Sequence, residues 1–171
     1  ASSVILDTTN NGTLPAGAAV TILGSVTSET LNFGLVIKGG TSGDVLVTGP
    51  IGMVGSGVAM GSLTIAGNDI TLSDIDGVVG NSNISASDGN DIGSVTLSGT
   101  VYRTTGALEI FTGPLNSSNI VSNQLMFTGG APGSATLIRT NGGSIEFAGA
   151  IDLNQRNVTM DTTGSGVFSN G

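Results

Sequence analysis

The sequence contains no cysteine, no histidine and no tryptophan, and only 9% of its residues are charged. Without cysteine the chain can form no disulfide and offers no thiolate metal ligand. Without histidine it has no imidazole for metal binding or for acid–base catalysis near neutral pH. A typical soluble domain carries about a quarter charged residues. These absences exclude the common zinc sites and the histidine-dependent classes of enzyme.

Basic residues are the scarcest charged type: four stand against 12 acidic residues, which gives a net charge of −8. They are scattered singly, at Lys38, Arg103, Arg139 and Arg156. No basic patch could neutralise a run of phosphates or hold an anionic membrane surface, so we expect no nucleic-acid partner. The sequence also lacks a run of about 18 apolar residues, so we expect no transmembrane segment.

Glycine and β-branched residues are abundant instead. Glycine occupies 29 of the 171 positions, and the 38% of hydrophobic residues are mostly Val, Ile, Leu and Ala. Glycine interrupts nearly every helical window, and β-branched side chains favour strands over helices. The composition therefore predicts an all-β chain without a long helix.

One short pattern recurs: a β-branched run that ends in a small residue and glycine. It occurs at residues 20–24, 45–49, 63–67, 95–99, 109–113, 125–129 and 145–149. The pattern is least regular between Gly67 and Gly99, where a degenerate copy near Ile84 would give steps of about 18 residues, near the length of solenoid repeats. That spacing predicts about eight or nine coils and, at a strand spacing of about 4.8 Å, a rod of roughly 40 Å.

These strands are too short to be stable singly. Stacked coil on coil, each would pair with the strands above and below, and the inward Val, Ile, Leu and Phe side chains would form ladders. Glycine and asparagine permit the sharp corners, because both tolerate positive φ. We therefore predict a parallel β-helix, that is, a β-solenoid. A β-sandwich is the alternative, although it favours clearer hairpin turns and a more aromatic core.

The two ends of the chain resemble each other. Residues 4–12 and 158–166 share an apolar strand, the sequence Asp-Thr-Thr and a closing glycine, with Asp7 and Asp161 in matching positions. Neither end resembles a cap, and exposed strand edges invite another copy. We expect residues 1–171 to form a single solenoid segment, one module of a longer array or filament. Its partners would be itself, end to end, or neighbouring repeat modules.

Two stretches carry a resemblance to a known group of proteins. Residues 4–24 contain Leu-Asp-Thr-Thr, Leu-Pro-Ala-Gly-Ala and Val-Thr-Ile in this order, and residues 143–152 and 157–163 read Gly-Ser-Ile-Glu-Phe-Ala-Gly-Ala-Ile-Asp and Asn-Val-Thr-Met-Asp-Thr-Thr. These stretches resemble the strand-repeat regions of large bacterial exported proteins, the filamentous-haemagglutinin-like adhesins and autotransporter passengers. The resemblance implies a right-handed parallel β-helix, export to the cell surface, and a scaffold or adhesive role with host or cell-surface glycans or proteins as partners. It implies no catalytic residue.

The start of the chain bears on its localisation. Ala1-Ser2-Ser3 has neither the basic nor the apolar region of a signal peptide. The chain also lacks an initiator methionine, so we expect it to be mature or excised. The resemblance implies that it is secreted and extracellular, at the cell surface.

Acidic residues cluster in the middle of the sequence. Five of them lie within 23 positions: Asp69, Asp74, Asp76, Asp88 and Asp91. Ca²⁺ prefers several carboxylate and carbonyl oxygens on turns, so a calcium site is one hypothesis, and a calcium-stabilised surface-layer-type module is one alternative function. The spacing matches neither the EF-hand nor the nonapeptide of calcium-binding rolls. Solvated turn carboxylates that keep the rod soluble are the simpler interpretation.

A polysaccharide-processing β-helix enzyme is the other alternative. Such enzymes use paired carboxylates, and Asp74 and Asp76 would share one face of an extended segment. A carbohydrate cleft usually also carries aromatic and basic residues, and Tyr102 is the one tyrosine of the chain. We therefore predict no enzyme, no catalytic residue and no cofactor beyond the hypothetical calcium. The predicted function is that of a structural rod or filament, a scaffold or adhesin that acts by stacking and self-association.

Overall fold

The computed structural model describes residues 3–28, 33–52, 59–86, 93–112 and 124–163. Within these ranges it contains 16 strands and no helix, and the strands pair with one another only in parallel. A sandwich is built from antiparallel sheets. The predicted all-β parallel β-helix is thus confirmed over the β-sandwich.

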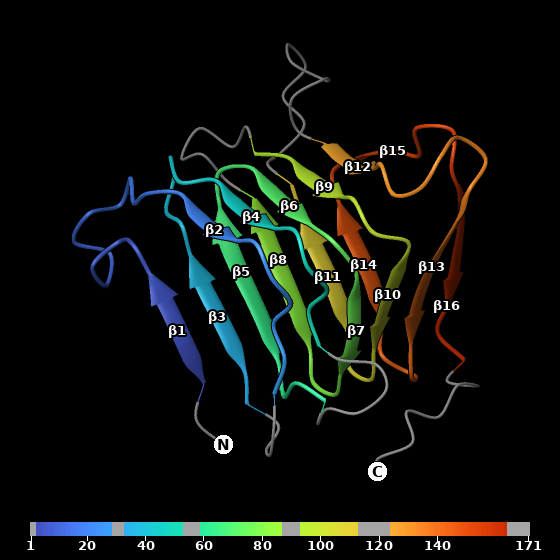
Figure 1. Cartoon of the computed structure of the whole chain (residues 1–171), viewed down its shortest axis with the longest axis horizontal. Helices are drawn as coiled ribbons and strands as arrows, with labels where there is room; N and C mark the ends of the chain where they lie inside the picture. Colours follow the sequence, from blue (N-terminus) through green and yellow to red (C-terminus); the bar gives the residue numbers. More distant parts are fainter. Residues whose placement is uncertain (1–2, 29–32, 53–58, 87–92, 113–123, 164–171) are drawn as a thin grey trace.

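The strands form three sheets around one core (Figure 1). Sheet A consists, in order, of β1 (Val4–Asp7), β3 (Leu35–Lys38), β5 (Leu63–Gly67), β8 (Ser82–Ala86), β11 (Leu108–Phe111) and β14 (Ile145–Ala148). Sheet B consists of β2 (Val20–Ile22), β4 (Val45–Val47), β6 (Ile70–Leu72), β9 (Val95–Leu97), β12 (Gln124–Phe127) and β15 (Ala150–Asp152). Sheet C consists of β7 (Ile75–Val78), β10 (Val101–Thr104), β13 (Ala135–Thr140) and β16 (Asn157–Asp161).

One strand from each sheet makes a coil, and the chain completes six coils, which we number from the N-terminus. In coils 1 and 2 the third side is a single bridged residue, Val26 and Ile51, in line with Ile75 of β7. Coil 1 and coil 6 lie at opposite ends of the stack, the first in blue and the last in orange and red (Figure 1). Every inner coil therefore pairs with a coil on each side, as in other solenoids.

The coil is longer than the predicted 18 or so residues. Along sheet A the chain advances by 31, 28, 19, 26 and 37 residues between the paired positions Val4, Leu35, Leu63, Ser82, Leu108 and Ile145. The predicted period was wrong because the strand–glycine pattern ends strands of both sheet A and sheet B. Coil 5 therefore contains two copies, and coil 4 contains one copy and the degenerate copy near Ile84. Six coils at about 4.8 Å place the first and last strands roughly 24 Å apart, which is shorter than the rod expected from the sequence.

The irregular region between Gly67 and Gly99 keeps the ladder intact. The degenerate copy near Ile84 is β8, which pairs with β5 on one side and with β11 on the other. Ser82 replaces an apolar residue at the start of this strand, and its buried hydroxyl has no hydrogen-bond partner among the described residues. The solenoid is therefore continuous where its sequence signal is weakest.

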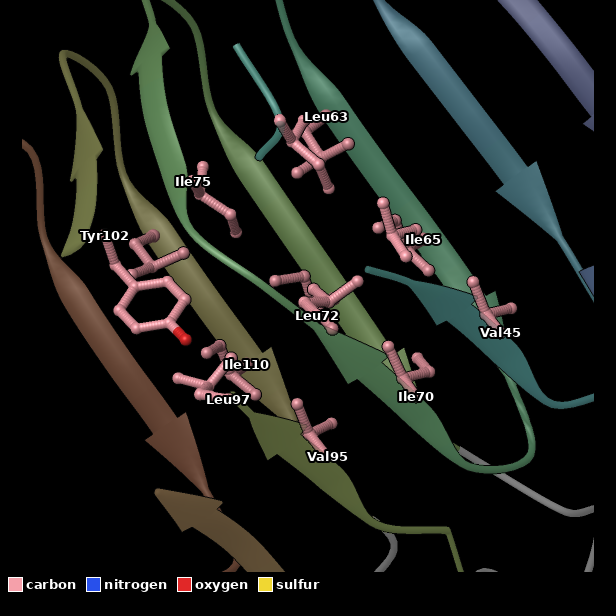
Figure 2. Close-up of a cluster of buried hydrophobic side chains, with 14 of the residues drawn as sticks. Val45, Leu63, Ile65, Ile70, Leu72, Ile75, Val95, Leu97, Tyr102 and Ile110 are labelled. Atoms are coloured by element: carbon pink, nitrogen blue, oxygen red, sulfur yellow. The ribbon is translucent and has the colours of Figure 1, made fainter. Parts of the chain in front are cut away.

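Inward side chains stack in columns along the axis of the coil. Ile65, Leu72 and Ile75, from the three sides of coil 3, are all fully buried (Figure 2). Burial of one such side chain stabilises the fold by about 1.5–3 kcal/mol. Tyr102 continues the sheet C column, its hydroxyl accepts the Gly99 N–H at 2.8 Å, and burial raises the pKa of its phenol far above the ordinary value. The apolar columns and this one buried phenol make up the core.

Glycine is required where successive coils touch at the corner between sheets B and C. A Cβ on Gly49 would lie 2.4 Å from the carbonyl carbon of Gly24 in the preceding coil. A Cβ on Gly129 would lie 1.8 Å from the carbonyl oxygen of Gly99. Real Cβ atoms essentially never approach within 3.0 Å, so the glycines that follow these strands allow the backbones to meet.

The similarity between the chain ends is local. Asp7 ends β1 in sheet A, whereas Asp161 ends β16 in sheet C. In both places the carboxylate accepts a backbone N–H and a hydroxyl from the threonine two residues on, at 2.7 and 2.6 Å for Thr9 and at 2.9 and 2.6 Å for Thr163. The similar Asp-Thr-Thr strand ends thus lie on two different sides of the coil, one in sheet A and one in sheet C. The longer array remains a prediction.

Candidate functional site

Of the five acidic residues in the calcium hypothesis, the structure describes three. Asp69 lies at the corner before β6, Asp74 lies at the corner before β7, and Asp76 lies within β7. Asp88 and Asp91 fall outside the described residues. Across the described ranges, no group of three or more acidic side chains is placed to hold a metal ion. The structure therefore separates these three carboxylates, and calcium binding stays a hypothesis.

Asp69 and Asp74 bind the backbone of the next coil. Asp69 Oδ1 accepts the Ser94 N–H at 2.9 Å and the Ser94 hydroxyl at 2.7 Å. Asp74 Oδ1 accepts the N–H groups of Thr100 and Val101 at 2.7 and 2.9 Å. Buried backbone donors need such acceptors wherever the sheet ladder is interrupted. These two carboxylates therefore act as caps between coil 3 and coil 4.

The corner before sheet A carries the same kind of contact, one coil further along the stack. Asn81 lies just before β8 of coil 4, and its Oδ1 accepts the N–H of Ala107, just before β11 of coil 5, at 3.1 Å. Each of the three kinds of corner thus has an Asp or Asn side chain that holds the following coil. We call Asp69, Asp74 and Asn81 the corner caps. The sequence contained a signal for them, because each contact spans 25 to 27 residues, which is about one coil.

Asp76 belongs to the outer face of sheet C and pairs with Arg103 on the neighbouring strand. Arg103 Nε donates to Asp76 Oδ1 at 2.7 Å, and a second contact joins Arg103 Nη2 to Asp76 Oδ2. The Asp76 residue is only 6% exposed. Asp74 and Asp76, the candidate catalytic pair, therefore have separate structural partners.

The other three basic side chains also bind within the chain. Lys38 lies 3.6 Å from Asp7, and Arg139 Nε donates to Asp161 Oδ2 at 2.9 Å. Arg156 donates to backbone carbonyls of the neighbouring coil, among them those of Thr128, Gly129 and Gly130 at 3.1, 3.3 and 2.8 Å. All four cations are thus engaged internally. They do not form a basic surface for an anionic ligand.

The hydrogen bonds at the two strand ends affect the acids there. The hydroxyl and N–H of Thr9 lower the pKa of Asp7, and those of Thr163 lower the pKa of Asp161. The nearby cations Lys38 and Arg139 lower these pKa values further. Both carboxylates are therefore ionised over the whole neutral range and stabilise the end coils in that form.

The two end coils carry the largest exposed apolar surface of the described chain. In coil 1 the exposed fractions are 56% for Val4, 37% for Leu6 and 76% for Leu23. In coil 6 they are 43% for Ile151 and 47% for Met160. The inward columns of Val4, Leu6, Ile151 and Met160 are almost fully buried in the inner coils, whereas Leu23 lies outside these columns. The end coils are therefore the strongest candidate functional site, and each is an open layer of a solenoid.

That the termini lack caps stays a prediction. The sequence did not predict the corner caps: Asp69 and Asp74 were candidate calcium ligands, and Asn81 was not singled out. In the part of the chain covered by the structure, no helix is long and apolar enough to cross a membrane.

Comparisons with known proteins give no match: no protein-family profile, no curated protein and no solved structure is significantly similar to this chain.

Proposed function

We propose that this chain is a structural module, a segment of an extracellular or cell-surface rod that acts as a scaffold and is extended by further coils at its ends. One observation carries the proposal: the same inward columns run through all six coils and end in exposed layers at both ends. A stack only about 24 Å long is a poor spacer by itself, so its mechanical use lies in continuation.

The internal use of polar groups supports a structural function. The corner caps and the four basic side chains are bound to the chain itself. A catalytic or ligand-binding surface would present some of these groups to solvent. The outer surface thus offers few directed charges, and this suits a scaffold whose specific chemistry is carried by its corners or by neighbouring modules.

The first experiment combines calcium titration with thermal unfolding of the purified chain. We expect the melting temperature to be equal in excess EDTA and in millimolar Ca²⁺, since Asp69, Asp74 and Asp76 are held by protein donors. A large rise with Ca²⁺ that Asp69→Asn removes would instead support the calcium-stabilised module. Asp44→Asn, one coil earlier at the same corner, is the matched control.

The second experiment tests turnover of neutral and acidic polysaccharides. We expect none. Turnover that disappears in Asp74→Asn or Asp76→Asn, with the circular dichroism spectrum unchanged, would overturn the structural function in favour of an enzyme.

A further inference from the structure

Coils 1 and 6 lie at opposite ends of the stack, and both expose apolar residues of the inward columns. We propose that a second copy of this chain docks head to tail on the first, with coil 6 of one copy against coil 1 of the next, so that sheets A and B continue in parallel and Val26 continues the inward column of sheet C. The inference rests on the proposed function and names the partner: another copy of the same chain.

The first support is the continuity of the apolar columns. Coil 1 presents five inward residues, and coil 6 presents five at the equivalent positions. They are Val4, Leu6, Val20, Ile22 and Val26 in coil 1, and Ile145, Phe147, Ile151, Leu153 and Met160 in coil 6. Every one of these ten residues is apolar. A head-to-tail contact would therefore add one more layer to each column and cover the exposed apolar area at both ends.

The second support is the geometry of the strand edges. β1 and β14 both have four residues, and β2 and β15 both have three. All run in the same direction around the coil, because every neighbouring pair in the stack is parallel. An open parallel edge is a template for a further parallel strand. The last coil thus matches the first in direction and, in sheets A and B, in strand length. On the third side the five-residue β16 would meet the single bridged residue Val26.

The third support is the register of charges. If the sheet A register is extended, Ile145 lies beside Val4 of the next copy and Phe147 beside its Leu6. Glu146 then faces Ile5, and Asp7 faces Ala148. No two like charges lie opposite each other in this sheet. A one-residue slip would bring the apolar residues to the outer face, so this register is the favoured one.

A head-to-head contact fits less well. It would reverse the direction of one coil, so that strands would meet antiparallel and the order of the three sheets around the axis would be inverted. At most one sheet could then continue into its own kind. The head-to-tail contact is heterologous, and such contacts build open filaments when rotation does not close them.

Gly24 gives a sharp probe of the contact. At Gly49 and Gly129, added Cβ atoms would strike the backbone of the preceding coil. Gly24 occupies the same corner in coil 1, and a Cβ there would meet nothing within 4 Å. In the isolated chain a side chain at Gly24 is therefore tolerated. In the head-to-tail contact it would project into the last coil of the preceding copy.

The experiment uses the full chain at increasing concentration, with light scattering after gel filtration and negative-stain microscopy. We expect wild-type protein to form linear assemblies of 16.7 kDa units that lengthen along the coil axis. Gly24→Arg should block one end and Ile151→Asp the other, each lowering association by roughly tenfold or more. Thr71→Arg, on the outer face of β6 in the middle of the stack, is the matched control and should assemble like wild type.

A mixture of the Gly24→Arg and Ile151→Asp variants tests whether the contact is head to tail or head to head. Gly24→Arg keeps an open coil 6 and Ile151→Asp keeps an open coil 1, so the mixture should form heterodimers that stop at two chains. Homodimers of either variant alone would indicate a head-to-head contact and overturn the proposal. If Ile151→Asp fails to fold by circular dichroism, Met160→Arg replaces it as the coil 6 variant.

Other outcomes are equally decisive. Assembly that is lost in Thr71→Arg but kept in Gly24→Arg would show lateral association and overturn the proposal. A wild-type chain that stays monomeric, and assembles only after removal of residues 164–171, would show that its own terminus occupies the site. A folded monomer under all conditions would refute docking of a second copy while leaving the structural function in a longer chain intact.

Discussion

The middle coils and the end coils of this solenoid both place apolar residues in the inward columns, but the exposure of these residues differs. In coil 3, Ile65, Leu72 and Ile75 are fully buried, and the corner caps Asp69 and Asp74 hold coil 4. In coils 1 and 6, Leu6 continues the column of Ile65 and Met160 continues the column of Ile75, but these side chains are 37% and 47% exposed. A layer of a solenoid is complete only when it has a neighbour on each side. Stability is therefore concentrated in the middle, whereas the ends remain open to association.

The largest expected effect comes from comparing the middle of one column in sheet B with its end in coil 6. Leu72→Ala in coil 3 should lower the free energy of unfolding by about 2–5 kcal/mol, because it leaves a cavity in a closed layer. Leu153→Ala, next to Asp152 in coil 6, should cost less than about 1 kcal/mol because Leu153 is already 45% exposed. Urea unfolding followed by circular dichroism measures both. Equal losses would show that coil 6 is as well packed as coil 3.

The second effect concerns the corner glycines. Gly49→Ala should destabilise the fold by about 1–3 kcal/mol, because the new Cβ meets the Gly24 backbone. Gly24→Ala is the matched control one coil earlier and should be neutral in the dilute monomer. Thermal unfolding at low concentration separates the two variants. A neutral Gly49→Ala would mean that adjacent coils do not approach as closely as described.

The third effect concerns the corner caps. Asp74→Ala removes the acceptor of two N–H groups from the next coil and should cost about 1–3 kcal/mol. Asp152→Ala in coil 6 removes only the hydrogen bond from the N–H of Asn154, two residues further along. It should therefore lower the free energy of unfolding by less than Asp74→Ala does. Hydrogen exchange at Thr100 and Val101 reports the loss directly. Unchanged protection there in Asp74→Ala would contradict the capping function.

The smallest effect is a pH dependence confined to the ends. Folding lowers the pKa of Asp7 and Asp161 below the ordinary 3.8, so their ionised forms stabilise the fold above that pH, and this contribution is lost as pH falls through the lowered values. The double variant Asp7→Asn, Asp161→Asn should therefore show a weaker fall in urea midpoint between about pH 5 and pH 3 than wild type. An equal fall in both proteins would show that other carboxylates govern acid unfolding.

Much of the fold was readable from the sequence, and the part that was not has a clear cause. The seven strand–glycine copies predicted real strands, and Ile84 marked the degenerate one. Sheet C lacks that pattern: β10 and β13 end in Thr104 and Thr140. Without a signal for the third side, copies from two sheets were counted as one series and the coil came out too short.

The candidate site was only partly predictable for a related reason. The repeat-like termini, which are visible in the sequence, led to the prediction that both ends lack caps. The positions of Asp69 and Asp74 at separate corners depend on coil length, and neighbours in sequence can lie on different sides of a coil. The spacing of Asp44, Asp69 and Ser94, 25 residues each, is the clue that would have given both the coil length and the caps.

The unequal lengths of the coils have a consequence for how such a chain can change. Successive positions of the sheet A column are separated by as few as 19 residues and as many as 37, yet the pairing register is unbroken. Because each doubling of a connecting segment costs only about 0.6 kcal/mol in closure entropy, insertions between strands are inexpensive. Selection, or an engineer, can therefore exchange surface peptides on this framework while its interior stays the same.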